Sequence, residues 1–154
     1  MQVQRGGKLT AHTPGQLVGY PIFDLGFHAL ATRAFVSRIE ESLQNALAQF
    51  GLNVDAHSDR PGLWKGPKKI VSLGFRIKDR ISSHGFSINI HNDLNIFRGF
   101  NPCGFAPESV ANMKEFLSEK TPLLAEVANA VAGSIACSFE QNVQNLEDTS
   151  KLLQ

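Results

Sequence analysis

The segment KIVSLGFRIKDRISSHGFSINIH, residues 69–91, carries the two clearest β-strand patterns of the chain. Its first half has an apolar residue at every second position, at Val71, Leu73, Phe75 and Ile77. Its second half alternates three apolar with three polar residues: Phe86, Ile88 and Ile90 with Ser87, Asn89 and His91. A period of two is typical of strands that bury one face. Because turn-like residues 78–84 separate the halves, the segment predicts an antiparallel strand pair over residues 69–77 and 86–91.

On either side of this pair, strand-like and helical stretches alternate irregularly. Residues 15–25 are strand-like, and Pro21 within them indicates an edge position or a bulge. Residues 29–50 carry apolar residues at three- and four-residue spacing, which predicts a helix. The remaining expected elements are short strands at 52–57 and 62–65 and helices at about 107–118 and 122–138. The sequence therefore predicts a single α+β domain over residues 1–154, with a mixed, mainly antiparallel sheet flanked by helices.

The composition excludes several classes of protein. A chain of 154 residues fits one domain with a real core, and a formal net charge of +1 gives no basic surface for nucleic acid. No apolar run approaches the roughly 20 residues that span a bilayer, and no nucleic-acid or membrane partner is expected. Two well-separated cysteines make a poor disulfide framework, and the N-terminus has no signal-peptide core. The sequence therefore predicts a cytoplasmic protein.

Cys103 follows the strand pair in the sequence Asn101-Pro102-Cys103-Gly104. Proline and glycine on either side predict a loop, where a substrate can reach the thiol. Because an ordinary thiol is mostly protonated at neutral pH, a nucleophilic cysteine needs a histidine or lysine nearby. Lys69 is attractive because it shares the strand parity of Val71 and the apolar face, where desolvation lowers the pKa of a lysine. The residues alone leave open that Lys69 is a strand-end lysine reaching solvent.

Several other features are ambiguous on the residues alone. Arg5-Gly6-Gly7-Lys8 lacks the pattern of a Walker motif, which leaves a glycine pair that a ligand approaches or a plain flexible terminus. His12 and His84 lie in turn-like sequence, where a lone histidine is more often structural. The five histidines show no metal-ligand spacing, so no metal site is expected. Cys137 lies in a helical pattern and is expected in the core.

Six segments in order resemble the octanoyltransferases of lipoate biosynthesis. They are RGG followed by His12, PGQLVGYP, GLW, KIVSLGFRI, SHGFSINI followed by DL, and NPCG. The resemblance runs from Arg5 to about Gly104, close to two-thirds of the chain. It implies the catalytic fold shared with biotin and lipoate protein ligases, and it favours functional roles for His12, His84 and Lys69.

The resemblance also implies a reaction and its residues. An octanoyl group would pass from acyl carrier protein to a lysine of a lipoyl domain, without a cofactor or metal. Cys103 matches the cysteine that carries the acyl group as a thioester, and Lys69 matches the lysine that lowers the pKa of that cysteine. The implied substrate contacts are Arg5, Gly6, Gly7, Lys8, Leu9, Thr10, Ala11, His12, Ser72, Leu73, Gly74, Gly85, Phe86 and Ser87, with His84 in support. The implied acceptors are the lipoyl domains of 2-oxoacid dehydrogenases and the glycine cleavage H protein.

The sequence departs from the family pattern at two places. Thr13 stands where the family usually has glycine, which is costly if that position needs a positive φ. Met1 lies only four residues before Arg5, where the family has a strand, a helix and part of the acyl pocket. We therefore expect an N-terminally truncated octanoyltransferase domain.

Three alternative functions remain at this point. An ATP-dependent lipoate ligase-like enzyme would survive Cys103→Ala and release pyrophosphate. An inactive truncated relative would bind carrier or lipoyl domains without acyl transfer. A thiol hydrolase would pair Cys103 with His84, so that replacing His84 would be more damaging than replacing Lys69.

Overall fold

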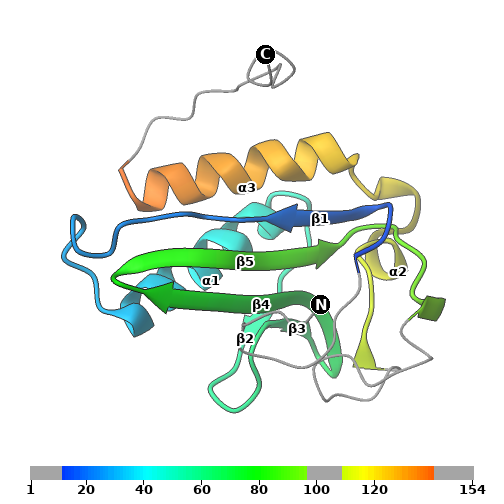
Figure 1. Ribbon diagram of the computed structural model, residues 1–154. Helices are drawn as coiled ribbons and strands as arrows, with labels where there is room; N and C mark the ends of the chain where they lie inside the picture. Colours follow the sequence, from blue (N-terminus) through cyan, green and yellow to red (C-terminus); the bar gives the residue numbers. More distant parts are fainter. Residues whose placement is uncertain (1–11, 97–108, 141–154) are drawn as a thin grey trace, which may run out of the picture.

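The sheet is antiparallel throughout, with five strands in the order β1-β5-β4-β3-β2. It is seen in a computed structural model, which describes residues 12–96 and 109–140 (Figure 1). The elements in chain order are β1 Gln16–Gly19, α1 Thr32–Ala48, β2 Asp55–Ala56, β3 Leu63–Lys65, β4 Lys68–Lys78, β5 Ile81–Asn89, α2 Lys114–Leu117, the 3-10 helix η4 Ser118–Lys120 and α3 Leu124–Ser138. This architecture confirms the predicted α+β class and the mainly antiparallel sheet.

The predicted central strand pair is confirmed as the hairpin of β4 and β5. Its register joins Val71 to Ile88 and, further along, Lys78 to Ile81. Only two residues, Asp79 and Arg80, form the turn, and both have positive φ, at 50° and 65°. That backbone is typical of a tight hairpin turn whose twist matches its strands. The expected longer turn over 78–84 is therefore wrong, because the strands extend almost to the hairpin tip.

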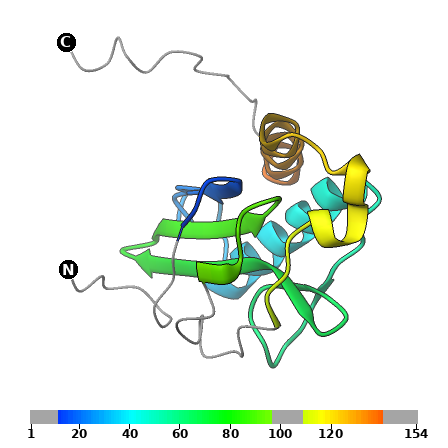
Figure 2. The same cartoon turned by 90° about the vertical axis from the view of Figure 1, so that its right-hand side faces the viewer.

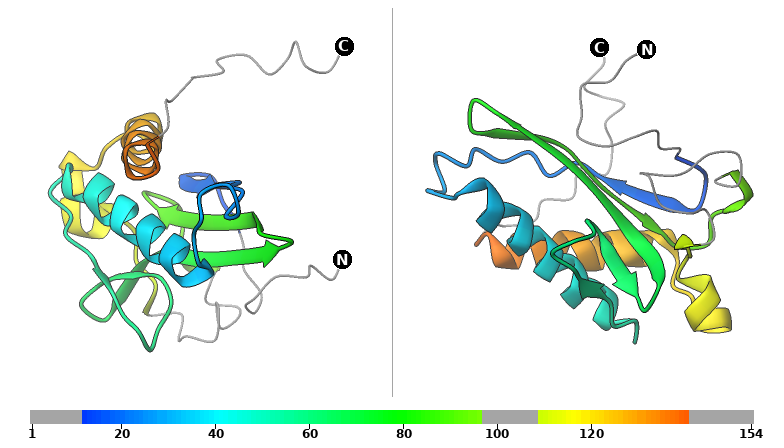
Figure 3. Two further views of the ribbon diagram at one scale, coloured as in Figure 1. Left: turned by 90° about the vertical axis from the view of Figure 1, so that its left-hand side faces the viewer. Right: turned by 90° about the horizontal axis from the view of Figure 1, so that it is seen from below.

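The two long helices cover one face of the sheet. Figures 2 and 3 show α1 and α3 on the same side of the strands. The ring of Phe35 in α1 lies edge-on to Phe75 of β4, with centroids 5.3 Å apart. The Ser42 hydroxyl of α1 donates to Ser138 of α3 at 2.7 Å, which joins the helices. The main core therefore lies between the helices and one sheet face, and it leaves the other face available for a site.

Two predicted elements differ from the structure. β1 ends at Gly19, well before residue 25, because Pro21 lacks the amide hydrogen that pairing requires. The predicted helix over 107–118 is wrong for residues 109–113, and in the described part helical structure begins only at α2 and continues into η4. The Ala111 amide donates instead to the carbonyl of Lys69 at 3.0 Å, and that of Met113 donates to Asn89 at 2.9 Å. These bonds to the sheet override the local helical pattern.

Candidate active site

Lys69, the second residue of β4, lies where β3 pairs with β4. Its partner is Trp64, while the next pair joins Leu63 to Val71, so the register shifts between Leu63 and Trp64. Such a bulge sets two residues of one strand against one of the other and interrupts the alternation of side chains. Leu63 and Val71 belong to the core on the helix side. Lys69 therefore shares the opposite face with Trp64, and its predicted parity with Val71 is wrong.

The side chain of Lys69 packs against Gly62 and Trp64. Only 4% of the residue is exposed, so Lys69 is not a strand-end lysine reaching solvent. Its Nζ lies 5.4 Å from the centroid of the Trp64 ring, within the range of a cation–π interaction. A Cβ on Gly62 would lie 2.5 Å from Cε of Lys69, and Gly62 has φ +109°. The segment Gly62-Leu63-Trp64 thus forms the lysine site, with Arg60 also over the indole at 4.5 Å.

Small side chains continue from Lys69 along the face that points away from the helices. The cross-strand pairs Ser72–Ser87 and Gly74–Gly85 follow one another along β4 and β5. Because the neighbouring Phe75 contacts α1, strand alternation turns Ser72 and Gly74 to the other face. None of the four carries more than a hydroxymethyl group. Together they form a low floor beside Lys69, which we call the small-residue floor.

Two other predicted substrate residues point away from this floor. Leu73 and Phe86 pair with each other across β4 and β5. Phe86 belongs to the core and is 5% exposed, and Leu73 packs against the same cluster. Their side chains therefore lie on the helix side, and only their backbone groups are available to a ligand beside Lys69.

The segment that contains Cys103 returns to the sheet at Lys69. Val110, seven residues after Cys103, forms a parallel bridge with Lys69. The next amide, that of Ala111, donates to the carbonyl oxygen of Lys69 at 3.0 Å. Residues 97–108, with Cys103 among them, lie outside the described residues.

The start of the same segment is held at the same place by side-chain amides. Asn92 Nδ2 donates to Asn89 Oδ1 at 3.1 Å, and Asn89 Nδ2 donates to the carbonyl of Ala111 at 3.1 Å. Asn112 Nδ2 donates to the carbonyl of Asn92, also at 3.1 Å, which joins the two ends directly. Both ends of the Cys103 segment are therefore closed beside the backbone of Lys69.

The turn before β1 joins this network. His12 Nδ1 lies 2.8 Å from Gln16 Oε1, and Gln16 Nε2 donates to Asn89 Oδ1 at 2.7 Å. Thr13 does not adopt a positive φ, so threonine is not strained there. Its hydroxyl oxygen accepts a hydrogen bond from Asn92 Nδ2 at 3.4 Å. The departure from glycine thus adds a contact at no backbone cost.

His84 lies at the far end of the hairpin. It pairs with Phe75, six residues along β4 from Lys69, which corresponds to roughly 20 Å of strand. Its φ of +59° is unusual for a residue other than glycine. The structure does not bring His84 together with Lys69.

The other predicted residues divide into two groups. Arg5 through Ala11 lie outside the described residues, as Cys103 does. Cys137 is exposed, so its expected place in the core is wrong. The inward stripe of α3 runs through Val127, Val131 and Ile135, and Cys137 falls on the outer side. The sequence pattern predicts the helix here but does not determine which face of it is buried.

Three residues of the network were not singled out from the sequence. Gln16, Asn89 and Asn92 are buried amides, exposed by 9%, 5% and 2%. Asn92 Oδ1 is buried and has no hydrogen-bond partner within the described part of the chain. The alternation along residues 86–91 places Asn89 on the face opposite Phe86 and Ile88, but it does not predict that this amide is buried.

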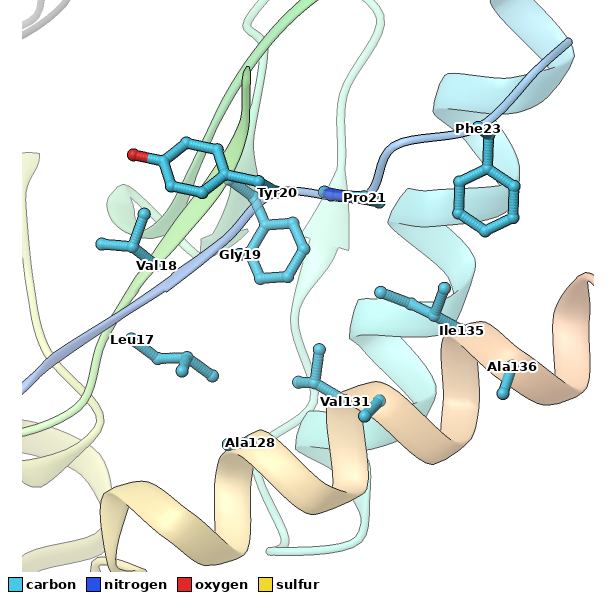
Figure 4. A pocket seen from close by; sticks show the side chains of 12 residues that line it. Leu17, Val18, Gly19, Tyr20, Pro21, Phe23, Ala128, Val131, Ile135 and Ala136 are labelled. Atoms are coloured by element: carbon cyan, nitrogen blue, oxygen red, sulfur yellow. The ribbon is translucent and has the colours of Figure 1, made fainter. Parts of the chain in front are cut away.

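An apolar groove of about 380 Å³ lies between β1 and α3 (Figure 4). Its walls are Leu17, Val18, Gly19, Tyr20, Pro21, Phe23, Phe86, Ala128, Val131, Ala132, Ile135 and Ala136. Because Leu17 and Phe86 point to the helices, the sheet separates the groove from Ser87 on the opposite face. The groove is distinct from the small-residue floor.

The described residues hold neither a metal-ligand cluster nor a membrane-spanning helix. No three His, Cys, Asp or Glu side chains within residues 12–96 and 109–140 gather as a metal site. Over the same ranges, every helix is too short or too polar to cross a bilayer.

The sequence profile of one family, described as "Lipoyl protein ligase A/B catalytic domain", matches residues 1–136. A curated protein named octanoyltransferase from Shewanella sp. (strain ANA-3) is 40% identical over 145 residues, which are 94% of this chain and 67% of that protein. The octanoyltransferase of Azotobacter vinelandii is 41% identical over 153 residues, covering 95% of this chain and 70% of its own length. That of Neisseria meningitidis serogroup C is 36% identical over 147 residues, covering 96% and 70%.

Solved structures agree on the fold. A lipoate-protein ligase A bound with ATP superposes with a TM-score of 0.69 at 19% identity, covering 96% of this chain and 62% of the ligase. A bipartite lipoate protein ligase from Thermoplasma acidophilum gives a TM-score of 0.69 at 18% identity, covering 96% and 60%. The likeness confirms the expected lipoate ligase-like fold. The chain spans less than two thirds of these ligases and about two thirds of the curated relatives.

Proposed function

The chain belongs to the lipoyl protein ligase A/B catalytic domain family and is a transferase like its octanoyltransferase relatives, and on that premise we propose its reaction. It performs acyl transfer in lipoate biosynthesis. An octanoyl group passes from octanoyl-acyl carrier protein to Cys103 as a thioester, and then to a lysine of a lipoyl domain.

The closure of the Cys103 segment beside Lys69 carries this proposal. Both ends of that segment bond at the Lys69 end of the sheet, through Ala111 on one side and Asn92 on the other. A buried ammonium close to a thiol favours the thiolate. The described anchors thus support the pairing of Cys103 with Lys69 that the family resemblance implies.

The first half-reaction exchanges one thioester for another. The Cys103 thiolate attacks the octanoyl carbonyl carbon, the new C–S bond forms, and the carrier leaves as a thiol. Because the bonds broken and formed are of the same kind, the exchange needs no ATP. Lys69 holds the proton that Cys103 gives up and supplies it to the leaving sulfur.

The second half-reaction makes an amide. The acceptor amine attacks the thioester carbon, the C–S bond breaks, and the proton that the amine nitrogen loses returns to the Cys103–Lys69 pair, which restores the thiolate beside the ammonium. The small-residue floor accommodates the extended octanoyl chain on the side of β4, where Ser72 and Gly74 carry the smallest side chains. Backbone N–H groups of the glycine-rich segments Arg5–His12 and Gly85–Ser87 stabilise the charge on the carbonyl oxygen.

The proposed partners follow from the same reaction. The donor is octanoyl-acyl carrier protein, and the acceptors are lipoyl domains of 2-oxoacid dehydrogenases and the glycine cleavage H protein. The proposed compartment is the cytoplasm, where these carriers occur in bacteria.

The test is intact-protein mass spectrometry under single-turnover conditions. Incubation with octanoyl-acyl carrier protein should add the mass of one octanoyl group, and peptide mapping should locate it on Cys103. Cys137, the exposed cysteine of α3, provides the matched control: Cys137→Ser should keep the adduct and Cys103→Ser should lose it. Absence of an adduct on intact folded protein would overturn the proposal. Octanoate-dependent pyrophosphate release from ATP would indicate a ligase instead.

A further inference from the structure

We infer that Gln16 and Asn89 are positioning residues that fix the proton of neutral His12 on Nδ1, so that Nε2 presents a lone pair at the Lys69 end of the sheet. Both residues are buried amides, and Asn89 also joins the two ends of the Cys103 segment. The inference rests on the direction of every hydrogen bond in one chain of groups.

The chain of groups starts at a backbone carbonyl, which can only accept. Asn89 Nδ2 donates to the carbonyl of Ala111 at 3.1 Å, and this contact fixes which end of the Asn89 amide is nitrogen. Asn89 Oδ1 then faces the other way. It accepts from Gln16 Nε2 at 2.7 Å and from Asn92 Nδ2 at 3.1 Å.

The same logic fixes the next two groups. Because Gln16 Nε2 donates to Asn89, Gln16 Oε1 must be the atom 2.8 Å from His12 Nδ1. An amide oxygen only accepts, so His12 Nδ1 must carry the hydrogen. The neutral ring then has its lone pair on Nε2.

Exchanging the oxygen and nitrogen positions of either side-chain amide would be energetically costly. Turning the Asn89 amide would set its oxygen against the Ala111 carbonyl, and turning Gln16 alone would set two oxygens together at Asn89. Gln16 is 9% and Asn89 5% exposed, so water cannot readily replace the lost bonds. Each unpaired buried group would then keep the full cost of its desolvation.

The location suggests what the lone pair does. The path from His12 through Gln16, Asn89 and Ala111 ends at the carbonyl of Lys69, so the ring lies at the same end of the sheet. His12 itself is exposed and accessible to a bound partner. This step rests on the proposed function.

The second half-reaction needs a proton acceptor. As the acceptor amine forms the C–N bond, its nitrogen becomes positively charged and must lose one proton. His12 Nε2 accepts that proton, the C–S electron pair leaves with the Cys103 sulfur, and the imidazolium then passes the proton to that thiolate. The opposite tautomer would present N–H to the amine and could not accept.

The first test needs no substrate. In wild-type protein labelled with ¹⁵N-histidine, two-bond proton–nitrogen spectra distinguish the tautomers at a pH where the ring is neutral. His12, assigned by loss of its signals in His12→Asn, should show a protonated Nδ1 and an unprotonated Nε2. A predominant Nε2–H form would overturn the inference. This readout stands apart from acyl transfer, so it separates failure of the inference from failure of the proposed function.

The second test separates the half-reactions. Gln16→Met keeps the side-chain length and removes both hydrogen bonds, so the fixed tautomer should be lost. Octanoylation of Cys103 should change less than about 3-fold, whereas transfer to the lipoyl lysine should slow about 10-fold or more. Gln44→Met, which removes the bond from α1 to the Val54 carbonyl, is the matched control and should change neither step. If Gln16→Met alters the His12 tautomer but leaves the rate of transfer to the lipoyl lysine unchanged, the proton-acceptor role is wrong. If Gln16→Met does not fold, the ¹⁵N-histidine spectrum of the wild-type protein decides whether His12 carries its proton on Nδ1.

Discussion

Gly62 and Lys69 are in such close contact that a Cβ on the glycine would lie 2.5 Å from Cε and 3.3 Å from Nζ of the lysine. The same Cβ would also meet the carbonyl oxygen of Val71, and the φ of +109° is one that glycine adopts without strain. The glycine therefore determines where the lysine side chain can lie. The side chain of Lys69 can occupy its observed position only if residue 62 is glycine.

We expect Gly62→Ala to displace Lys69 and to slow octanoylation of Cys103 about 10-fold or more, since small misplacements of reacting groups carry large rate penalties. Gly66→Ala is the matched control, because Gly66 also has a positive φ, at 57°, but has nothing within 4 Å of the added Cβ. It should cost about 1–2 kcal/mol of stability from its backbone alone and keep the acylation rate. Equal rates in the two variants would show that the contact with Lys69 is irrelevant.

Replacing the lysine itself should affect the reaction more than the fold. Lys69→Met keeps an unbranched side chain as far as Cε, which packs against Gly62, and removes the charged Nζ that lies over Trp64. We expect acylation of Cys103 to fall about 10²–10⁴-fold, the range for loss of a general acid–base group. Lys68→Met, one residue away and on the other face of the strand, should change the rate less than about 3-fold. A Lys69→Met enzyme within 3-fold of wild type would argue against the pair.

The sequence was sufficient for the hairpin but not for the bulge that positions Lys69. Alternation along residues 69–77 and 86–91 is local, and each strand displays it alone. The bulge arises from the way Leu63 and Trp64 of β3 pair with β4. This pairing cannot be predicted from the residue pattern of β4 alone. Of the two alternatives that the residues left open, the structure shows the buried Lys69, but on the opposite face from the one that strand parity indicated.

Contacts that are distant in the sequence also explain why the predicted helix does not form near residue 110. Locally these residues favour a helix, but the amides of Ala111 and Met113 bond to Lys69 and Asn89 of the sheet. The buried amides follow the same rule, since Gln16 and Asn89 lie 73 residues apart in the chain. Motif resemblance identified Lys69 and His12, but only the fold shows the amides that link them.

The small-residue floor predicts how acyl-chain preference can be changed. Ser72→Val adds bulk beside Ser87 and should raise the KM for octanoyl donors about 10-fold, while a butanoyl donor changes less. The readout is the ratio of kcat/KM for the two donors. Ser37→Val, on the exposed side of α1, should leave that ratio unchanged. If the ratio is equally unchanged in Ser72→Val, the acyl chain lies elsewhere.

Two glycines with different surroundings should respond oppositely to alanine. A Cβ on Gly85 would collide with the carbonyl oxygen of Gly19 and approach Cδ of Pro21 at 2.9 Å, so Gly85→Ala should push β1 from the sheet. We expect a loss of about 2 kcal/mol or more in the free energy of unfolding. Gly133, on α3, has nothing within 4 Å, so Gly133→Ala should add about 0.5–1 kcal/mol. Urea denaturation checks both signs, and a stabilised Gly85→Ala would contradict the close approach.

Replacing Glu40 of α1 with glutamine should increase the stability of the protein in a pH-dependent way. Burial, and then the nearby charge of Glu41, raise the pKa of the Glu40 carboxyl above its ordinary value. The folded protein therefore binds this proton more tightly than the unfolded chain, and the charged form lowers stability once the pH rises through the folded pKa. Glu40→Gln should raise the Tm at pH 7 by less than about 2 °C, because the carboxyl is only half-buried. The gain should disappear as the pH falls to about 4, near the ordinary pKa of glutamate.

Glu41→Gln is the control, because it removes only the smaller cause of the raised Glu40 pKa, and it should give a smaller gain in Tm at pH 7. If the gain from Glu40→Gln persists at pH 4, it comes from packing and not from charge.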